Sequence, residues 1–371
     1  MVKILLVANV SKEHVLKFHV PTIKHLTELG WTVDVACGGK EVVPYCRRQI
    51  ELPIDRSPFK TLFCKAIKQL KKEIAEEKYD IVYCHTTVGG IVARLAANKF
   101  RKQGVRVVKF AHGTYFYEGA PLMNWICYPL YKWMSWMTDE LITITKEDFE
   151  FSSKHFPHCK VYYVPGIGVD PNRFFITGRE EIRLKYRQEL NLPSDATVCI
   201  YVAELIKNKN QKMLLDALRC LKGKGRNDVY LLLVGPDHTN GEYASYAKKL
   251  GISEHVRFLG WRSDIKELYA TSDICTASSI REGLGLNIVE AMVCDIPVIA
   301  TANSGHKAVI ENGKNGLLVS IFDSAEMADQ INSLSQDVHR RTSLVEESQS
   351  DISKYYNDNV LAKLTKILEK K

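Results

Sequence analysis

Two glutamates, Glu282 and Glu290, lie eight residues apart on either side of the glycine-rich run Gly283-Leu284-Gly285-Leu286. The glycines let backbone amides approach a ligand closely. A helix that begins at about Leu286 would also point its free N–H groups and its positive dipole end outward. The segment therefore predicts an anion-binding cradle flanked by two carboxylates.

Two other interpretations of this segment are possible. An ordinary helix start with an acidic first turn is the simpler one, because many helices begin with acidic residues. A dinucleotide-binding fingerprint is the more specific interpretation, but it requires a third glycine where this chain has Ile288. NAD is therefore disfavoured, and the helix start stays open beside the anion cradle.

The elements around this segment repeat one pattern along the chain. With 371 residues, the chain is longer than one hydrophobic core usually supports, which favours two domains. Short β-rich runs, among them residues 81–84, 106–111 and 274–277, alternate with helical stretches in both halves, as in βαβ units with a parallel sheet. In such open sheets the ligand lies beyond the carboxyl ends of the strands, so we expect a site in a cleft between two similar α/β halves.

Cysteine usage and hydropathy limit the class of protein. The ten cysteines include no Cys-x-x-Cys pair, which predicts free thiols in a reducing compartment and no zinc site. The apolar run at residues 1–10 has the length of a buried strand and not that of a signal peptide. No uncharged apolar run approaches the roughly 20 residues of a membrane span. These features predict a cytoplasmic protein.

The net charge of +8 is unevenly distributed. Residues 1–165 hold 24 Lys and Arg against 16 Asp and Glu, whereas residues 166–371 hold 27 of each kind. Such an excess suggests an anionic partner of the first half, either a membrane surface or nucleic acid, although solvated lysines without a partner would give the same count. No nucleic-acid-binding motif accompanies the charge.

Two segments of the first half are candidates for contact with a membrane. Residues 58–72 are basic and amphipathic, and residues 122–137 are rich in aromatic residues and nearly uncharged. Together they could form an interfacial surface for anionic lipid at the inner face of the cell membrane. The alternatives are a solvated face over a buried helix for the first segment and a buried core helix for the second.

Four motifs in order along the chain point to one family. Glu282 to Glu290 form an E-x7-E motif, residues 110–121 read Phe-Ala-His-Gly-Thr-Tyr-Phe-Tyr-Glu-Gly-Ala-Pro, residues 165–170 read Pro-Gly-Ile-Gly-Val-Asp, and residues 204–211 form a candidate phosphate loop. The chain resembles the retaining GT-B glycosyltransferases of family 4, in their bacterial capsular and exopolysaccharide branch. It departs from them at Glu204, where an arginine is common, and at residues 9–14, which lack a Gly-Gly pair.

The resemblance implies the GT-B fold, an α/β architecture of two Rossmann-like parallel-sheet domains that face each other across a cleft. Residues 1–167 would form the N-terminal, acceptor-side domain, and residues 168–352 would form the C-terminal domain that binds the nucleotide-sugar. Residues 353–371 would form a helix that crosses back to the N-terminal domain. Closure of the domains could then be coupled to donor binding.

The activity implied is retaining transfer of a hexosyl or N-acetylhexosaminyl group from a nucleotide-sugar donor, which we expect to be a UDP-sugar. The acceptor would be a lipid-diphosphate-linked sugar in the synthesis of a surface polysaccharide. The donor is a co-substrate, and no cofactor is expected. The chain has no Asp-x-Asp triplet to hold a nucleotide-bound metal ion, which fits the metal-independent chemistry of the family.

The resemblance also implies roles for individual residues. The catalytic residues would be Glu282, beside the donor sugar in an electrostatic and positioning role, and His112, in contact with that sugar. Lys209 and the amides near Gly285 would bind the diphosphate, and Glu290 would accept hydrogen bonds from the ribose. Residues 260–262, with Arg262, resemble the base-contacting loop.

Each assignment has a simpler alternative. Lys209 could be an ordinary surface lysine, His112 could be structural, and Trp261 could belong to the core. Two other functions also remain open: a nucleotide-sugar epimerase of GT-B architecture, and a non-catalytic sugar-nucleotide binder, which the departure at Glu204 permits.

Overall fold

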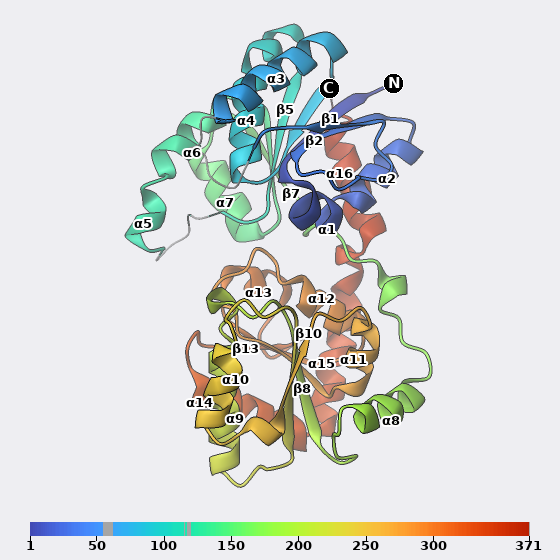
Figure 1. The fold of residues 1–371 in the computed structure, drawn as a ribbon, viewed down its shortest axis with the longest axis vertical. Helices are drawn as coiled ribbons and strands as arrows, with labels where there is room; N and C mark the ends of the chain where they lie inside the picture. Colours follow the sequence, from blue (N-terminus) through green and yellow to red (C-terminus); the bar gives the residue numbers. More distant parts are fainter. Residues whose placement is uncertain (55–61, 115, 117–119, 371) are drawn as a thin grey trace. The chain divides into compact units, whose positions relative to one another are not determined.

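The structure is a computed structural model that describes residues 1–54, 62–114, 116 and 120–370. The chain divides into two compact units (Figure 1). Unit 1 comprises Met1–Gly168 and Asn357–Lys371, and unit 2 comprises Val169–Tyr356. Among the described residues, no helix has both the length and the apolar character needed to cross a membrane.

Unit 1 is built on a parallel sheet of seven strands in the order β3-β2-β1-β4-β5-β6-β7. The strands are β1 (Lys3–Val10), β2 (Thr32–Gly38), β3 (Arg48–Glu51), β4 (Ile81–Cys84), β5 (Arg106–Ala111), β6 (Glu140–Thr143) and β7 (Lys160–Tyr163). The helices are α1 (Leu16–Phe18), α2 (Val20–Glu28), α3 (Leu62–Glu77), α4 (Thr87–Ala97), α5 (Leu122–Trp125), α6 (Tyr128–Ser135), α7 (Lys146–His155) and α16 (Asn357–Leu368). Residues 4–8 of β1 are all buried, as expected of a strand in a sheet covered on both faces.

Unit 2 repeats this plan with six parallel strands in the order β10-β9-β8-β11-β12-β13. The strands are β8 (Thr197–Val202), β9 (Val229–Val234), β10 (Val256–Gly260), β11 (Ile274–Ala277), β12 (Val298–Thr301) and β13 (Leu317–Val319). The helices are α8 (Arg179–Glu189), α9 (Gln211–Gly223), α10 (Glu242–Lys249), α11 (Ile265–Thr271), α12 (Leu286–Val293), α13 (Ser304–Val309), α14 (Ser324–Gln336) and α15 (Val338–Asp351). The predicted pair of Rossmann-like parallel-sheet domains is confirmed.

In each sheet the strand order reverses at one point, between β1 and β4 in unit 1 and between β8 and β11 in unit 2. Loops that leave neighbouring strands at such a switch point run in opposite directions and leave space for a ligand beyond the carboxyl ends of the strands. The residues considered below follow β1, β4 and β5 in unit 1 and β8, β10, β11 and β12 in unit 2. The topology therefore determines where each group of side chains can meet.

Helix α3 corrects one of the two membrane hypotheses. Its apolar residues Ala66 and Leu70 are fully buried in the core of unit 1, and Phe63 and Ile67 pack against the same core. The apolar side of this helix is therefore not free to enter a lipid surface. The alternative of a solvated face over a buried helix holds for residues 63–72, and residues 58–61 lie outside the described residues.

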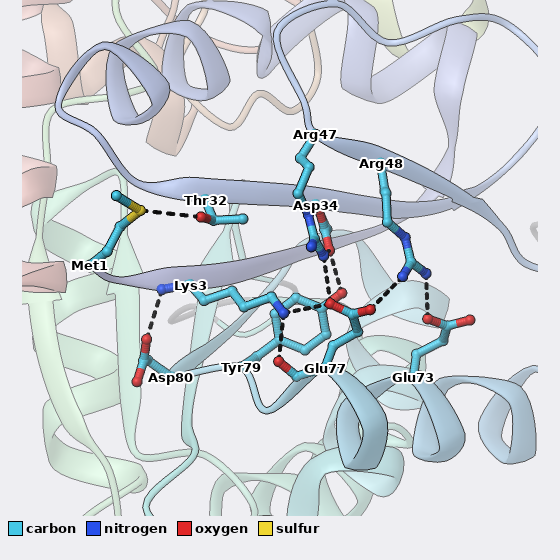
Figure 2. Close-up of polar contacts among 10 residues, drawn as sticks. All are labelled: Met1, Lys3, Thr32, Asp34, Arg47, Arg48, Glu73, Glu77, Tyr79 and Asp80. Carbon is cyan, nitrogen blue, oxygen red and sulfur yellow. Dashed lines mark hydrogen bonds and ion pairs between the residues drawn. The ribbon is translucent and has the colours of Figure 1, made fainter.

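A network of ion pairs joins the amino-terminal side of the unit 1 sheet to the end of α3 (Figure 2). The buried Asp34 of β2 accepts hydrogen bonds from the Tyr79 hydroxyl at 2.6 Å and from Arg47 Nε at 2.9 Å. Arg48 binds Glu73 and Glu77, each at 2.6 Å. This network lies at the opposite end of the strands from the switch point, so we assign it to stability.

Replacement of Asp34 with asparagine should lower the free energy of unfolding by about 2 kcal/mol at pH 7, because a buried partner of Arg47 loses its charge. Burial alone would raise the pKa of Asp34, but hydrogen bonds from Arg47 and Tyr79 lower it below its ordinary value. The stabilisation is thus present above the pKa of the unfolded state and is lost as the pH falls toward the folded value. Urea unfolding at several pH values should show the difference between wild type and Asp34→Asn shrinking below about pH 4.

Candidate functional site

Glu282 lies in the loop between β11 and α12 of unit 2, and its carboxylate is already engaged. Its Oε1 accepts a hydrogen bond from the Ser279 hydroxyl at 2.6 Å and a short one from Lys209 Nζ. The Tyr201 hydroxyl, in turn, lies 2.6 Å from Ser279 Oγ. The side chains of Glu282 and Lys209 are only 14% and 23% exposed, so Lys209 is not an ordinary surface lysine.

Hydrogen bonds tie the loop after β8 to the loop after β11. The Ile280 amide donates to the Asn208 carbonyl at 2.8 Å, and the Asn208 side chain donates to the Arg281 carbonyl at 2.9 Å. The Ser278 hydroxyl donates to the Lys209 carbonyl at 2.9 Å. The candidate phosphate loop and the glutamate loop are therefore held together, at the switch point of the sheet.

The glycine-rich run ends where the sequence predicts. Gly285 has a φ of +81° and caps α12, which begins at Leu286. Leu284 is buried, and Gly283 is half-buried. A positive φ at this position favours glycine, and it frees the amides at the start of the helix to face a ligand. This is the backbone that an anion cradle requires.

Glu290 corrects one detail of the sequence analysis. It is the fifth residue of α12 and lies in the second turn, whereas the first turn carries no acidic residue. The interpretation as an ordinary helix start with an acidic first turn is therefore wrong. Because dipole effects are confined to the first turn, the helix dipole does little to stabilise the Glu290 carboxylate.

The environment of Glu290 leaves its carboxylate short of partners. The side chain is half-buried, and among the described residues burial and the charge of Arg173 influence the carboxyl group, with no hydrogen bond to it. Burial raises its pKa to about 7, and Arg173 opposes that shift. A carboxylate in this state gains most from a ligand that brings hydroxyl donors.

The connection that follows β12 contains two further residues of the site, Gly305 and His306, which the sequence analysis did not identify. Asn303 caps α13, and its Oδ1 accepts a hydrogen bond from the His306 amide at 3.0 Å. His306 Nδ1 lies 2.7 Å from the Thr301 carbonyl, and burial lowers the pKa of the ring to about 4. The neutral ring thus donates from Nδ1, and its Nε2, which has no partner among the described residues, is an acceptor beside Gly285.

Gly305 fixes the position of Glu282 by its lack of a side chain. A Cβ added at Gly305 would lie 2.7 Å from both the Cβ and the carbonyl oxygen of Glu282. The signal in the sequence was weak: a small residue with polar neighbours just after a buried strand.

Replacement of Gly305 with alanine should lower kcat about 10–100-fold, because a displacement of about 1 Å in a catalytic group can cost that much. The matched control is Gly223→Ala at the end of α9, where an added Cβ would meet nothing within 4 Å. Steady-state kinetics of both variants test this. Equal activity of Gly305→Ala and the wild type would show that the loop does not need this close contact.

The loop expected to contact the base has a different arrangement. The Arg262 guanidinium donates to Asp264 at 2.8 Å and lies 3.6 Å from Glu189, so two carboxylates of its own unit already hold it. Trp261 is 74% exposed, which excludes the alternative that it belongs to the core. Glu204 is half-buried, with its carboxylate 4.0 Å from His238 Nε2.

In unit 1, His112 lies directly after β5 with three other histidines that the sequence analysis missed. One ring nitrogen from each of His14, His19, His85 and His112 lies within 4.8 Å of those from the other three. Burial lowers the pKa of His112 well below its ordinary value, so its ring is neutral at physiological pH. The signal was a histidine directly after each of two neighbouring strands, β4 and β5.

Helices α5 and α6 and the residues next to them expose large apolar side chains. Exposed fractions are 87% for Leu122, 74% for Met123, 67% for Ile126, 49% for Trp133 and 58% for Trp136. The alternative of a buried core helix for residues 122–137 is therefore wrong. Large groups of exposed apolar side chains mark surfaces that bind a protein, a ligand or a membrane.

Comparison with known proteins gives the family. Residues 3–145 match the family model "Glycosyl transferase 4-like", and residues 182–351 match "Glycosyl transferases group 1". The Bacillus subtilis protein named "Putative glycosyltransferase EpsD" is 43% identical over 335 residues, which cover 90% of this chain and 87% of that protein. An Escherichia coli UDP-Gal:alpha-D-GlcNAc-diphosphoundecaprenol alpha-1,3-galactosyltransferase is 27% identical and is aligned over 70% of this chain and 67% of its own length.

Solved structures agree on the fold. The Anabaena protein Alr3699/HepE, crystallised with UDP and glucose, has a TM-score of 0.81 to this chain at 22% identity, and the match covers 99% of both chains. The lipopolysaccharide-biosynthesis glycosyltransferase WaaG has a TM-score of 0.77 at 17% identity, over the whole of both chains. The expected GT-B fold is thereby confirmed. With its two family matches and a relative that is 43% identical over 90% of the chain, it belongs to the family 4 glycosyltransferases of the GT-B fold.

Proposed function

We propose that this enzyme is a retaining glycosyltransferase that moves a sugar from a UDP-sugar to a lipid-diphosphate-linked glycan in the synthesis of a surface polysaccharide. One observation carries the proposal: four groups of unit 2 are arranged around one switch point. They are Lys209, Glu282, the carboxylate of Glu290 and the backbone amides that follow Gly285. The E. coli relative, whose name specifies UDP-galactose and a diphosphoundecaprenol acceptor, supports these substrate classes.

Lys209 and the free amides at the start of α12 bind the donor diphosphate in this proposal. Negative charge grows on the diphosphate as the glycosidic bond breaks, and fixed donors aimed at that charge lower the barrier. In the structure, Lys209 is paired with Glu282. A diphosphate competes for the ammonium group and leaves the Glu282 carboxylate available for the sugar.

Glu282 then accepts a hydrogen bond from a sugar hydroxyl and stabilises positive charge at the anomeric carbon, which has oxocarbenium character in the transition state. The Ser279 hydroxyl and the close contact with Gly305 keep the carboxylate in position. Glu290 accepts hydrogen bonds from the ribose hydroxyls, which provide the partners that its half-buried carboxylate lacks. His112 of unit 1 contacts the donor sugar, and its neutral ring suits a hydrogen bond to a hydroxyl.

Helices α5 and α6 dock the enzyme on an anionic membrane, where the lipid-linked acceptor resides. The exposed Trp133 and Trp136 are accompanied by the exposed Lys132 on α6. Arg101 donates to the Trp136 carbonyl at 2.6 Å, so the short helix Asn98–Gln103, which also exposes lysines, adjoins this surface. Aromatic side chains beside lysines match the interface of an anionic bilayer.

A double variant, Trp133→Ser with Trp136→Ser, should reduce sedimentation with anionic liposomes about tenfold or more, because it removes two interfacial aromatic side chains. Binding of the wild type should weaken as salt rises. The control is Phe322→Ser, which removes an aromatic side chain that is 66% exposed on unit 2. Equal sedimentation of the double variant and the wild type would place the membrane contact elsewhere.

Incubation with a panel of sugar nucleotides, with and without a lipid-diphosphate-linked acceptor, tests the activity. Transfer predicts slow donor hydrolysis alone and faster, acceptor-dependent release of the nucleoside diphosphate. Formation of an epimer would instead identify a nucleotide-sugar epimerase, and binding without turnover would identify a non-catalytic binder.

A further inference from the structure

Four histidines converge at the switch point of unit 1 on short connections from different strands. His14 lies in the short helix Ser11–Val15 directly after β1, and His19 precedes α2. His85 follows β4, and His112 follows β5. Because β1, β4 and β5 are consecutive in the parallel sheet, their carboxyl ends bring these side chains together. We refer to the four as the histidine cluster.

The spacing of the ring nitrogens is close to that of a metal site. Nε2 of His14 and Nε2 of His19 are 3.1 Å apart, and Nδ1 of His85 and Nε2 of His112 are 3.4 Å apart. A tetrahedral zinc ion with Zn–N bonds of about 2.05 Å places its ligand nitrogens about 3.3 Å apart. Two edges of such a tetrahedron are thus already formed. One ligand atom from each residue lies within 4.8 Å of all the others, so small movements of the rings would complete it.

Burial keeps the four rings in the protonation state that a metal requires. His19 and His85 are buried, and the pKa of each is well below its ordinary value, first because of desolvation. His14 and His112 are less buried, which leaves a route for an ion to enter, and desolvation lowers the pKa of His14 to about 4. A neutral imidazole carries one free lone pair, which is its metal-binding form.

The lone pairs of the histidine cluster have few other partners. His85 Nε2 is buried without a hydrogen bond from any residue that the structure describes. No described carboxylate is bonded to any of the four rings, so none acts as a proton acceptor that would hold them as cations. Each neutral ring has one N–H and one lone pair, so the close contacts between His14 and His19 and between His85 and His112 can be hydrogen bonds, while His85 Nε2 has no partner among the described residues. A metal ion would instead bind one lone pair from each ring.

Lys109 is the positive group that faces the cluster, and its charge opposes a cation there. Its Nζ is buried and donates to the Thr86 carbonyl at 2.6 Å. Desolvation lowers the pKa of Lys109 to about 7, so the neutral amine is accessible at physiological pH. The repulsion between Lys109 and a bound ion can therefore be relieved by loss of one proton.

We propose that the histidine cluster binds a late first-row divalent metal ion, with Zn²⁺ as the principal occupant. Imidazole nitrogen is a preferred ligand of Zn²⁺, Cu²⁺ and Ni²⁺, whereas Mg²⁺ and Ca²⁺ prefer oxygen. The missing Asp-x-Asp triplet and Cys-x-x-Cys pair, on which the expectation of no metal rested, have no bearing on a site made only of histidine. The proposal concerns unit 1 and is independent of the assignments in unit 2. If His112 binds the ion through Nε2, its Nδ1 carries the N–H that can donate to a sugar hydroxyl.

The test uses full-length protein without an affinity tag, stripped of metal and titrated with Co²⁺ as a spectroscopic probe and with Zn²⁺ in calorimetry. One equivalent of Co²⁺ should give the intense visible bands of a tetrahedral nitrogen site, and Zn²⁺ should abolish them. A double variant, His19→Ala with His85→Ala, should bind at least about 100-fold more weakly, since loss of even an outer-shell partner costs 10–100-fold.

His158→Ala is the matched control, because this exposed histidine of unit 1 stacks on Trp136 away from the cluster. It should bind Co²⁺ as the wild type does. Melting temperatures measured with and without Zn²⁺ show whether each variant is folded. Zn²⁺ should raise the Tm of the wild type and of His158→Ala. It should not raise the Tm of His14→Gln, which alters one ligand at the less buried side of the cluster. Absence of Co²⁺ bands, or an equal Zn²⁺ effect on all variants, would show that the four rings form only a hydrogen-bonded cluster.

Discussion

Replacement of Glu282 with glutamine should lower kcat about 100–1,000-fold and leave the KM for the donor unchanged or lower. The effect is of the size found when a preorganised group that stabilises transition-state charge is removed. Glutamine fills the same space and can still accept from Ser279, so the loop keeps its shape. Lys209 loses its resident carboxylate and becomes more available to the diphosphate, which is why donor binding should not suffer.

Steady-state kinetics with saturating acceptor measure this separation of kcat from KM. The control is Glu311→Gln, which alters an exposed glutamate of unit 2 that pairs with Lys314. Turnover within about threefold of the wild type would reduce Glu282 to a structural partner of Lys209. A higher KM at unchanged kcat would instead place Glu282 in ground-state binding.

The second large effect is expected at Glu290, where glutamine should raise the KM for the donor about 10–100-fold, with a smaller change in kcat. Hydrogen bonds to a charged acceptor contribute about 1.5–3 kcal/mol, and the variant loses the charge. The folded-state pKa of Glu290 is about 7, and the ionised form is the better acceptor. Donor affinity of the wild type should therefore rise between about pH 6 and pH 8, and that of Glu290→Gln should stay flat.

The stability of the Glu290 variant separates this role from a structural one. Because burial raises the pKa of this acid above its unfolded value, the ionised carboxylate costs folding free energy above pH 7. Glu290→Gln should therefore have a Tm no lower than that of the wild type at pH 8. A lower Tm, together with an unchanged pH profile of donor affinity, would contradict the ribose assignment.

Strand alternation and the glycine-rich run predicted much of the fold because they follow from local physics. Ile81–Cys84, Arg106–Ala111 and Ile274–Ala277 have the predicted bounds, since buried parallel strands are short runs composed largely of apolar residues. The edge strand β3 was missed because Arg48–Glu51 is mostly polar and its partner β2 determines it. Edge strands lack the apolar pattern on which prediction depends.

In the site, too, features that depend on neighbouring residues could be predicted, whereas contacts between distant residues could not. The start of α12 followed from Gly285, whose conformation is a local property. The pairing of Lys209 with Glu282 joins residues 73 positions apart, and the approach of Gly305 to Glu282 depends on how α13 packs. The histidine cluster likewise combines residues from the connections that follow three different strands. A local sequence pattern does not show which distant residues approach one another, so only the folded chain could reveal these contacts.

The most direct test of the central claim is the anomeric configuration of the product. The enzyme would be incubated with a UDP-sugar that supports turnover and with a lipid-diphosphate-linked sugar, and the new linkage would be analysed by NMR spectroscopy. Retaining transfer predicts a glycosidic bond with the same anomeric configuration as the donor, formed only when acceptor is present. An inverted linkage, or consumption of the donor without any new glycosidic bond, would contradict it.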